Sequence, residues 1–321
     1  MTRVLLWHVH GSWTTSFVQG DHDYLIPTLP EGGPWGLGRA GRDWPDRAVE
    51  VPVDRLADTE VDVVLLQRPE EVELAGRWLR RAPGVDVPAI YVEHNTPKGD
   101  VPTSRHPMVD RPELLLVHVT HFNQVMWDTG STPTTVVEHG VVDPGPRYIG
   151  DLPRVAVVVN EPVRRGRVTG TDLLPHFASA APLDVYGMGL EGLRDSLGLA
   201  ADRLVEVGDL RTTALHRELA RRRVYAHPMR WTSLGLSLIE AMHLGMPVVV
   251  LASTEAVRAV PPEAGVVSTR IDDLVRGAAE LVRDPELARH QGKQAREFAL
   301  ANYGLAAFLR RWDHLLTEVS R

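Results

Sequence analysis

Short, continuous apolar runs rich in β-branched residues recur along the chain, and this pattern constrains the fold more than any other feature. Strands that are apolar at every position, instead of at alternate positions, are typical of a parallel sheet covered on both faces. We interpret the following runs as such strands: Val4–His8, Val61–Leu66, Ala89–Glu93, Leu114–Val119, Thr135–Glu138, Val155–Val159, Leu183–Tyr186, Leu204–Val207, Val224–Ala226 and Val248–Leu251.

Helical patterns separate several of these runs, so the order strand–helix–strand indicates βαβ units with right-handed crossovers. The expected helices are Glu70–Arg81, Phe122–Asp128, Thr213–Arg222, Ser237–Leu244 and Ile271–Arg283. The Gly/Pro-rich stretch Pro27–Asp46 has no clear period and is expected to be a long surface loop. A second such stretch, Val142–Arg154, predicts a linker that divides the 321 residues almost in half.

Composition narrows the class of protein. The net charge is −7 and cysteine is absent, which argues against a nucleic-acid partner and excludes disulfides and thiolate nucleophiles. No window reaches the roughly 18 apolar residues of a spanning helix, and the first apolar run is short for a signal peptide. We therefore expect a cytoplasmic protein without a transmembrane segment, and peripheral membrane contact stays open.

The richest motif runs from Thr232 to Val249, with the sequence TSLGLSLIEAMHLGMPVV. A loop follows the strand that ends at Ala226, and a helix is expected to open near Gly235. The free amides and the dipole of a helix N-terminus favour an anion such as a phosphate. Glu240, inside this helix, can accept hydrogen bonds from a vicinal diol such as a ribose.

This segment resembles the donor-binding signature of retaining glycosyltransferases of the GT-B fold, family 4 (group 1 glycosyltransferases), in which two Glu residues stand eight positions apart. The resemblance implies that Glu240 holds the nucleotide ribose and that Gly235 and Leu236 lie at the donor phosphates. The first Glu of the family, which contacts the donor sugar, is replaced by Thr232, which we assign to the catalytic site at that position. The likeness is good over residues 135–316 and weak before them.

The resemblance also implies a GT-B architecture of two Rossmann-like, doubly wound α/β domains facing an interdomain cleft. The expected domains are residues 1–148, on the acceptor side, and residues 152–303, which bind the nucleotide-sugar. Residues 304–321 are expected to form a helix that crosses back to the first domain.

A loop with several arginines follows the first strand of the second half, where the family places an Arg and a Lys that clamp the donor diphosphate. Here Thr169 stands in place of that Lys. Arginine presents a fork that can pair with two phosphate oxygens. We expect Arg165 and Arg167 to bind the diphosphate; the alternative is a solvated basic loop without a ligand.

Two residues of the first half are further candidates. His94 directly follows an expected strand, where the family carries a His beside the donor sugar, and we assign it a catalytic role; the alternative is a His that closes the strand end. Gly11 stands where the family has a Gly-rich loop near the diphosphate. Asp21, His22 and Asp23 spell the metal motif DxD but follow no expected strand, so no metal is predicted.

These observations predict a metal-independent, retaining glycosyltransferase of the hexosyltransferase type. The donor is expected to be a UDP- or GDP-linked sugar, used as a substrate and not as a cofactor, and the acceptor a small molecule, glycan or lipid. Two alternatives stay open: a non-catalytic GT-B protein that binds nucleotide-sugar, and a GT-B sugar-nucleotide epimerase.

Overall fold

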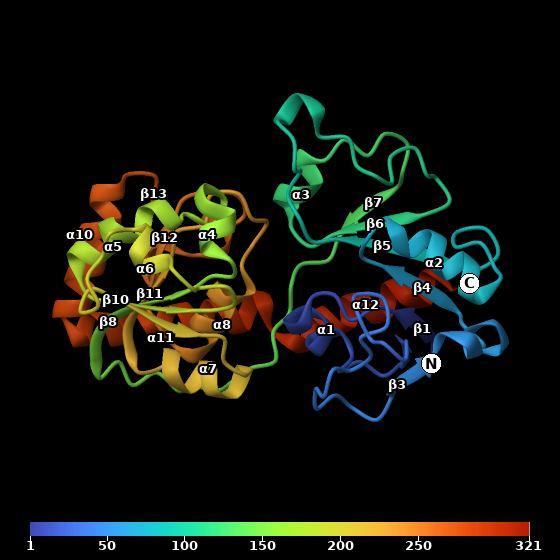
Figure 1. Cartoon of the computed structure of the whole chain (residues 1–321), viewed down its shortest axis with the longest axis horizontal. Helices are drawn as coiled ribbons and strands as arrows, with labels where there is room; N and C mark the ends of the chain where they lie inside the picture. Colours follow the sequence, from blue (N-terminus) through green and yellow to red (C-terminus); the bar gives the residue numbers. More distant parts are fainter. Residues whose placement is uncertain (321) are drawn as a thin grey trace. The chain divides into compact units, whose positions relative to one another are not determined.

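The computed structural model describes residues 1–320, which form two compact units (Figure 1). Unit 1 comprises Met1–Val142 and the C-terminal segment that begins at Leu305, and unit 2 comprises Asp143–Gly304. Each unit is built on one parallel sheet, which confirms the predicted α/β class. Within the described residues, no helix combines the length and apolar character that crossing a bilayer requires.

Unit 1 contains a seven-stranded sheet in the order β3-β2-β1-β4-β5-β6-β7. The strands are β1 (Arg3–Leu6), β2 (Asp23–Thr28), β3 (Ala48–Pro52), β4 (Val63–Leu66), β5 (Ala89–Glu93), β6 (Leu115–His118) and β7 (Thr134–Val136). The α-helices are α1 (Gly11–Phe17), α2 (Glu70–Leu79), α3 (His121–Met126) and α12 (Leu305–Val319), and the 3-10 helices are η1 (Val53–Asp58) and η2 (Val101–Thr103).

The expected loop Pro27–Asp46 lies between two strands that were not predicted, β2 and β3, and only its first two residues, Pro27 and Thr28, belong to a strand. Pro27 lies inside β2, where it pairs in register with Val51 of β3. The neighbouring strand β1 pairs only with Asp23–Leu25 of β2. The N–H that Pro27 lacks is therefore not needed by β1, and the proline is tolerated near the end of the strand.

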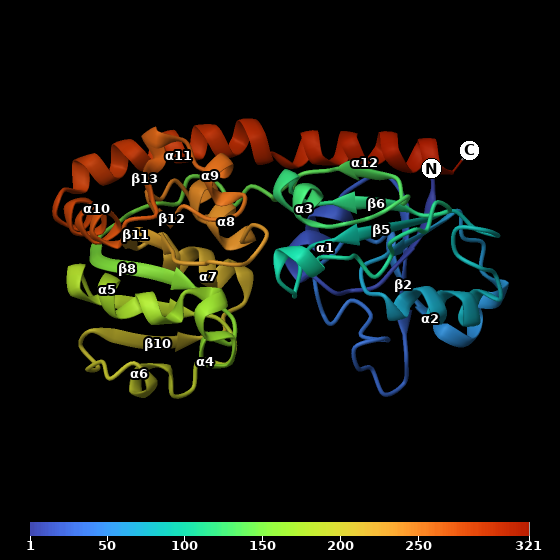
Figure 2. The same cartoon turned by 90° about the horizontal axis from the view of Figure 1, so that it is seen from above.

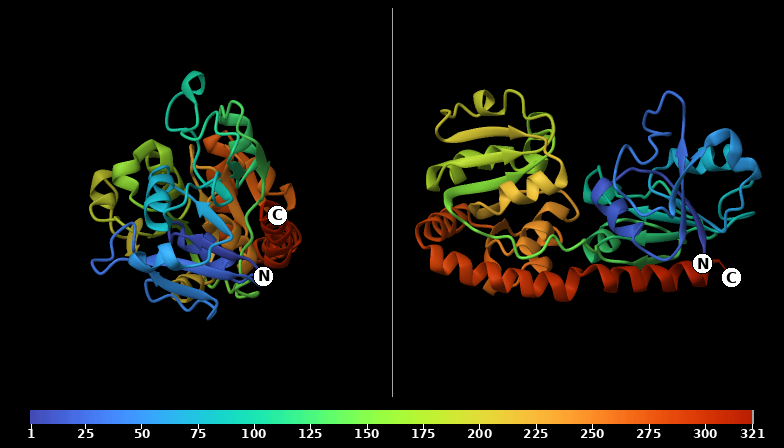
Figure 3. Two further views of the ribbon diagram at one scale, coloured as in Figure 1. Left: turned by 90° about the vertical axis from the view of Figure 1, so that its right-hand side faces the viewer. Right: turned by 90° about the horizontal axis from the view of Figure 1, so that it is seen from below.

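The two faces of the unit 1 sheet are covered by α2 on one side and by α12 on the other (Figure 2). Trp312 of α12 packs edge-on against Trp13 and Phe17 of α1, at ring-centroid distances of 5.7 and 5.1 Å. Phe308 is also buried in this cluster. The last helix of the chain therefore lies beside the first one and belongs to the core of unit 1 (Figure 3).

Unit 2 contains a six-stranded sheet in the order β10-β9-β8-β11-β12-β13. The strands are β8 (Leu152–Val158), β9 (Leu183–Tyr186), β10 (Leu204–Gly208), β11 (Arg222–His227), β12 (Val248–Leu251) and β13 (Gly265–Ser268). The α-helices are α4 (Pro162–Arg165), α5 (Leu174–Ala180), α6 (Leu193–Ser196), α7 (Thr212–Leu219), α8 (Leu236–Leu244), α9 (Ala256–Ala259), α10 (Ile271–Arg283) and α11 (Pro285–Tyr303), with 3-10 helices η3 (Gly166–Thr169), η4 (Thr171–Leu173) and η5 (Pro262–Ala264).

Helices α5 and α10 cover one face of this sheet, and α7, α8 and α11 cover the other (Figure 1). The β-branched residues that predicted the strands form the core between these layers; Val155, Val157 and Val224 are fully buried. Strand β13 was not predicted, because it lies at the edge of the sheet and its four residues are only half-buried.

Candidate functional site

Strands β8 and β11 are neighbours in the unit 2 sheet although they are its first and fourth strands in the chain. This is the point where the strand order reverses, and ligands of doubly wound sheets bind at the carboxyl ends of strands there. The loops that follow these two strands are joined, because the backbone N–H groups of Arg230 and Trp231 donate to the carbonyl of Val168 at 3.0 and 3.2 Å. The segments that carry the predicted donor-site residues therefore meet.

Gly170 allows this close approach. Its φ is +71°, and a Cβ at this position would overlap the carbonyl of Pro228 in the opposite loop. A glycine is required here both by the left-handed backbone and by the neighbouring carbonyl.

Helix α8 begins at Leu236 after Gly235, which has no side chain to cap the first turn. The first amides of α8 therefore have no side-chain acceptor and are available to an anion. A Cβ on Gly235 would lie 2.6 Å from Cε1 of the buried His227 ring. Burial lowers the pKa of His227 to about 4, so the ring beside this helix start is neutral at pH 7.

Glu240 lies one turn into α8 and is 7% exposed. Its Oε2 is 3.4 Å from Nε2 of His216, a buried residue of α7. The contact with His216 uses one carboxylate oxygen of Glu240. The carboxylate can therefore accept further hydrogen bonds, which the two hydroxyls of a ribose diol would donate. His216 was not among the predicted site residues, because it lies on a helix without a motif and only the packing of α7 against α8 brings it to Glu240.

Thr232, the residue in place of the family's first Glu, lies in the loop between β11 and α8. Its hydroxyl is buried and has no hydrogen-bond partner within residues 1–320. A buried, unpaired hydroxyl is costly, and a hydroxyl-bearing ligand would supply the missing partner.

The two arginines predicted to bind diphosphate differ in the structure. Arg165, at the end of α4, is half-buried, and its guanidinium makes no ion pair or hydrogen bond within the described chain. Burial and the nearby Arg164 lower the pKa of Arg165. Arg167 is exposed and pairs with Asp172 at 2.8 Å. Glu161 opposes the lowering of the Arg165 pKa, but its carboxylate forms its ion pair with Arg164, so Arg165 is the one of the two predicted arginines without an ion pair of its own.

Asp172 is shared between two arginines. Both nitrogens of the Arg230 fork contact its carboxylate, in addition to Arg167. The three charges tie η3 and η4 to the loop after β11, so Arg167 and Arg230 have a structural role in holding the two loops together.

In unit 1, strands β1, β4 and β5 are adjacent, and the residues directly after them are Trp7, Gln67 and His94. Nε2 of His94 lies 3.1 Å from Oε1 of Gln67. The His94 ring also packs against the ring of His10 at a tilt of 35°, with 4.0 Å between ring centroids. Trp13 meets the edge of His94 at 5.1 Å. The strand order of unit 1 reverses between β1 and β4, so His94, after β5, is held one strand away from the reversal point.

The imidazoles at this edge are neutral at pH 7. Burial, reinforced by His10 and His139, holds the pKa of His94 well below its usual range. Burial also lowers the pKa of His10 to about 4, with a contribution from Arg68, and that of His139 to about 3. Within residues 1–320, no group of three or more His, Asp or Glu side chains is placed to hold a metal ion.

Gly11 is the first residue of α1, and its neighbour is the guanidinium of Arg42, which also donates to Nε2 of His8 at 3.2 Å. Gly11 thus lies after β1, and its expected place near the diphosphate stays a prediction. Of the DxD motif, Asp23 begins β2, and His22 is buried and accepts a hydrogen bond from the amide of Thr2.

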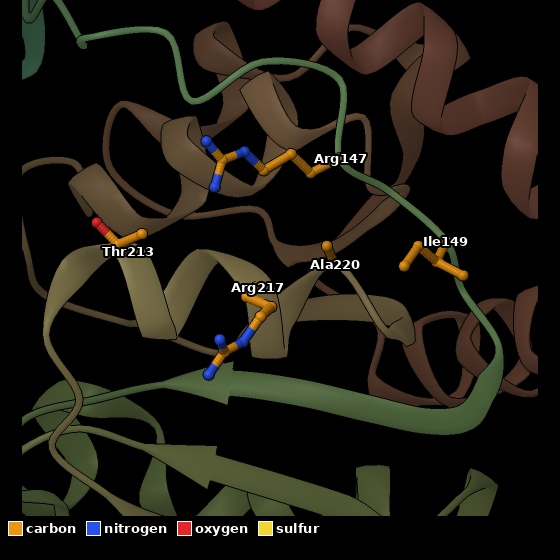
Figure 4. Close-up of a pocket in the computed structure, with 5 residues that line it drawn as sticks. All are labelled: Arg147, Ile149, Thr213, Arg217 and Ala220. Carbon is orange, nitrogen blue, oxygen red and sulfur yellow. The ribbon is translucent and has the colours of Figure 1, made fainter.

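A separate cavity of about 180 Å³ lies in unit 2 between α7 and the segment before β8 (Figure 4). It is lined by Arg147, Ile149, Thr213, Arg217 and Ala220. None of these residues was predicted to be functional, and none is in the loops that follow β8 and β11.

Residues 192–298 of unit 2 match the family model described as glycosyl transferases group 1. This part of unit 2 is similar to group 1 glycosyl transferases. The matched stretch contains Thr232, Gly235, Leu236 and Glu240, and it begins after Arg165 and Arg167. A search of curated protein sequences found no relative of the chain.

Solved glycosyltransferase structures share the fold over nearly the whole chain. HepE from Anabaena, in complex with UDP-glucose, is 14% identical with a TM-score of 0.71, covering 99% of this chain and 100% of that chain. Sucrose-phosphate synthase from Thermosynechococcus elongatus is 15% identical with a TM-score of 0.70, covering 99% of both chains. A glycosyltransferase from Rickettsia africae is 12% identical with a TM-score of 0.69, covering 99% of this chain and 97% of that chain. The predicted GT-B fold is confirmed.

Proposed function

We propose that this protein moves a sugar from a UDP- or GDP-linked donor to an acceptor hydroxyl, with retention of configuration at the anomeric carbon. The observation that carries the proposal is the start of α8. This helix N-terminus has no side-chain cap and lies at the reversal point of the sheet, and the buried carboxylate of Glu240 follows it after one turn.

In this proposal, unit 2 binds the donor. Glu240 accepts hydrogen bonds from the ribose hydroxyls, and the amides at Gly235 and Leu236 contact the diphosphate together with Arg165. The guanidinium of Arg165 supports this assignment, because a half-buried cation whose pKa is lowered by burial and by the neighbouring Arg164 favours an anionic ligand. Arg165 and the α8 dipole would balance the charge that develops on the departing diphosphate, so we propose that no metal ion is required.

Unit 1 is proposed to contribute His94, which would accept a hydrogen bond from a hydroxyl of the reacting sugars. The bond between the anomeric carbon and the diphosphate oxygen breaks, and a bond from that carbon to the acceptor oxygen forms on the same face. The acceptor proton goes to the leaving diphosphate oxygen, so atoms and charges balance without a covalent enzyme intermediate.

We place the reaction in the cytoplasm, since a chain without cysteine suits a reducing compartment.

One observation favours a second function, the binding of nucleotide-sugar without catalysis. Thr232 carries a hydroxyl where the family signature has a carboxylate, so one expected contact to the donor sugar differs. A protein of this kind would bind the donor through Glu240 and Arg165 but release no transferred product.

Two measurements, made one after the other, test the proposal. A thermal-shift screen against UDP-, GDP- and dTDP-sugars identifies the donor, because a ligand that binds only the folded state raises the melting temperature. Incubation of that donor with candidate small-molecule, glycan and lipid acceptors, with the anomeric configuration of the product read by NMR, then tests transfer and retention. An inverted product would overturn retention. Donor binding without multiple turnovers would favour the binding function, and an isomerised donor formed without acceptor would favour an epimerase.

A further inference from the structure

Gln67 occupies the middle of three adjacent strand ends in unit 1. It directly follows β4, which lies between β1 and β5 in the sheet. Its side-chain Nε2 donates to the carbonyl of Trp7, after β1, at 2.9 Å, and its Oε1 lies 3.1 Å from Nε2 of His94, after β5. One amide therefore ties together the residues that follow three neighbouring strands.

The backbone of Gln67 is anchored as well. Its N–H donates to the carboxylate of Glu71 at 2.6 Å, and its carbonyl accepts from the hydroxyl of Tyr91 at 3.4 Å. The residue is 4% exposed. The amide thus has a defined place, and its two ends face two different partners.

These contacts determine which way the Gln67 amide points. The Trp7 carbonyl can only accept, so it must face the NH₂ group of Gln67. The opposite orientation would place two acceptor oxygens against each other. Oε1 of Gln67 therefore faces His94, and as an acceptor it requires a hydrogen on Nε2 of that ring.

We propose that Gln67 is a positioning residue that holds His94 in the Nε2–H tautomer and so presents its Nδ1 lone pair as an acceptor for a substrate hydroxyl. This inference rests on the proposed function, in which His94 meets the reacting sugars. Nδ1 has no hydrogen-bond partner within residues 1–320, whereas the ring is clamped by His10 and Trp13.

The tautomer matters because this imidazole is neutral. Burial and the neighbouring His10 and His139 lower the pKa of His94, so at pH 7 one ring nitrogen donates and the other accepts. If the proton moved to Nδ1, the ring would offer a donor where the substrate hydroxyl needs an acceptor, and two lone pairs would face each other across the 3.1 Å contact with Gln67.

The decisive experiment is ¹⁵N NMR of the full chain labelled at histidine, at pH 7, with the His94 signals assigned by comparison with His94→Ala. We expect the wild-type protein to show a protonated Nε2 and an unprotonated Nδ1. Gln67→Met, which removes both hydrogen bonds at similar volume, should lose this single tautomer. Gln124→Met is the matched control, because Gln124 of α3 donates to the hydroxyl of Thr134 in β7 and has no hydrogen bond with His94. The spectrum of this variant should keep the His94 signals of the wild-type protein.

Kinetics with the identified donor and acceptor form the second readout. Gln67→Met should lower kcat about tenfold, the loss expected for one hydrogen bond, with unchanged affinity for the nucleotide. Gln67→Glu keeps an acceptor toward Nε2–H but loses the donor to the Trp7 carbonyl, so it should retain the tautomer and recover only part of kcat. Its carboxylate also favours the imidazolium, so the acid limb of the pH profile should move to higher pH.

Each outcome is decisive. A wild-type His94 protonated on Nδ1, or an unchanged tautomer in Gln67→Met, overturns the proposal. A changed tautomer with unchanged kcat also overturns it, because Gln67 would then not position a reacting group. If Gln67→Met does not fold, the wild-type and Gln67→Glu spectra still decide. If no donor and acceptor pair reacts, the proposed function has failed, and the NMR result on the Gln67–His94 pair stands independently.

Discussion

The carboxylate of Glu240 on α8 lies 3.4 Å from Nε2 of His216 on α7, and both side chains are buried. If the carboxylate holds a ribose diol, its removal should weaken nucleotide binding by about 1.5–3 kcal/mol, as for hydrogen bonds to a charged group. We expect Glu240→Ala to lose this amount and Glu240→Gln to lose less, because the amide keeps one acceptor.

Isothermal titration calorimetry with the nucleoside diphosphate of the identified donor measures this loss. His216→Gln is the matched control, since it changes the partner but leaves the carboxylate, and it should have a smaller effect. Equal affinity for the wild-type protein and both Glu240 variants would remove the residue from the donor site.

Arg165 and Arg167 should respond differently to truncation. Arg165→Ala removes a guanidinium that has no partner within the described chain and should weaken binding of the nucleoside diphosphate by about 1.5–3 kcal/mol, while leaving the nucleoside unaffected. Arg167→Ala should change the affinity little, because that side chain is already paired with Asp172. Calorimetry with the nucleoside and its diphosphate checks both claims; a larger effect at Arg167 would reverse the assignment.

His94→Ala should reduce turnover and leave nucleotide binding intact. The side chain lies in unit 1, whereas the proposed nucleotide contacts are all in unit 2. A positioned hydrogen-bonding or proton-transferring group contributes about 100-fold or more to rate, so kcat should fall by that order. Initial rates and nucleotide titrations on the same preparation separate the two effects, and a variant with normal turnover would show that the reacting groups lie elsewhere.

Stability should fall when the pH is lowered below about 6.5, where an unfolded histidine begins to take up a proton. Burial lowers the pKa of His139 in the folded protein to about 3. Between these values the unfolded state binds more protons than the folded state, so the free energy of unfolding decreases as the pH falls. The urea midpoint of unit 1 should therefore be lower at pH 5 than at pH 7.

His139→Asn should reduce this difference between pH 5 and pH 7, whatever its effect on stability at pH 7. The exposed His314 provides the control, since His314→Asn removes a histidine that is not buried. A pH dependence that is identical in the wild-type protein and His139→Asn would contradict the assignment.

Gly235→Ala tests the start of α8. The backbone φ of Gly235 is −71°, which alanine adopts freely, so the obstacle is the His227 ring that lies 2.6 Å from the added Cβ. Overpacking of this kind costs about 1–3 kcal/mol and should shift the first turn, lowering both stability and nucleotide affinity. The double variant Gly235→Ala/His227→Ala should recover affinity relative to the single one; no recovery would mean that the ring is not the cause.

The central strands could be predicted from the sequence because burial on both faces leaves an uninterrupted apolar run. Ala89–Glu93, Leu183–Tyr186 and Val248–Leu251 have the predicted bounds. Strands β2, β3 and β13 lie toward the sheet edges, where polar residues, Pro27 and Gly265 interrupt that signal. Their pairing depends on neighbours distant in the chain, which a local pattern does not contain.

The residues of the candidate site could be predicted where they lie in a sequence motif. They could not be predicted where only the packing of the folded chain brings them to the site. The TSLGLSLIE run predicts the helix that presents Glu240, but no spacing links that residue to His216. The loop sequence likewise does not distinguish Arg165 from Arg167, because the difference depends on Asp172 and Arg230. Gln67 had no signal, since a single amide after an apolar strand is indistinguishable from any polar loop residue.

The membership of α12 in unit 1 has a consequence for biosynthesis. A ribosome delivers Trp13 and Phe17 long before Trp312, which packs against them. Unit 2 is continuous in the chain and can fold as it emerges, whereas the aromatic surface of unit 1 stays uncovered until α12 has been made. Such surface is prone to association between nascent chains. We therefore expect nascent chains to be most prone to association in the interval between the synthesis of α1 and that of α12.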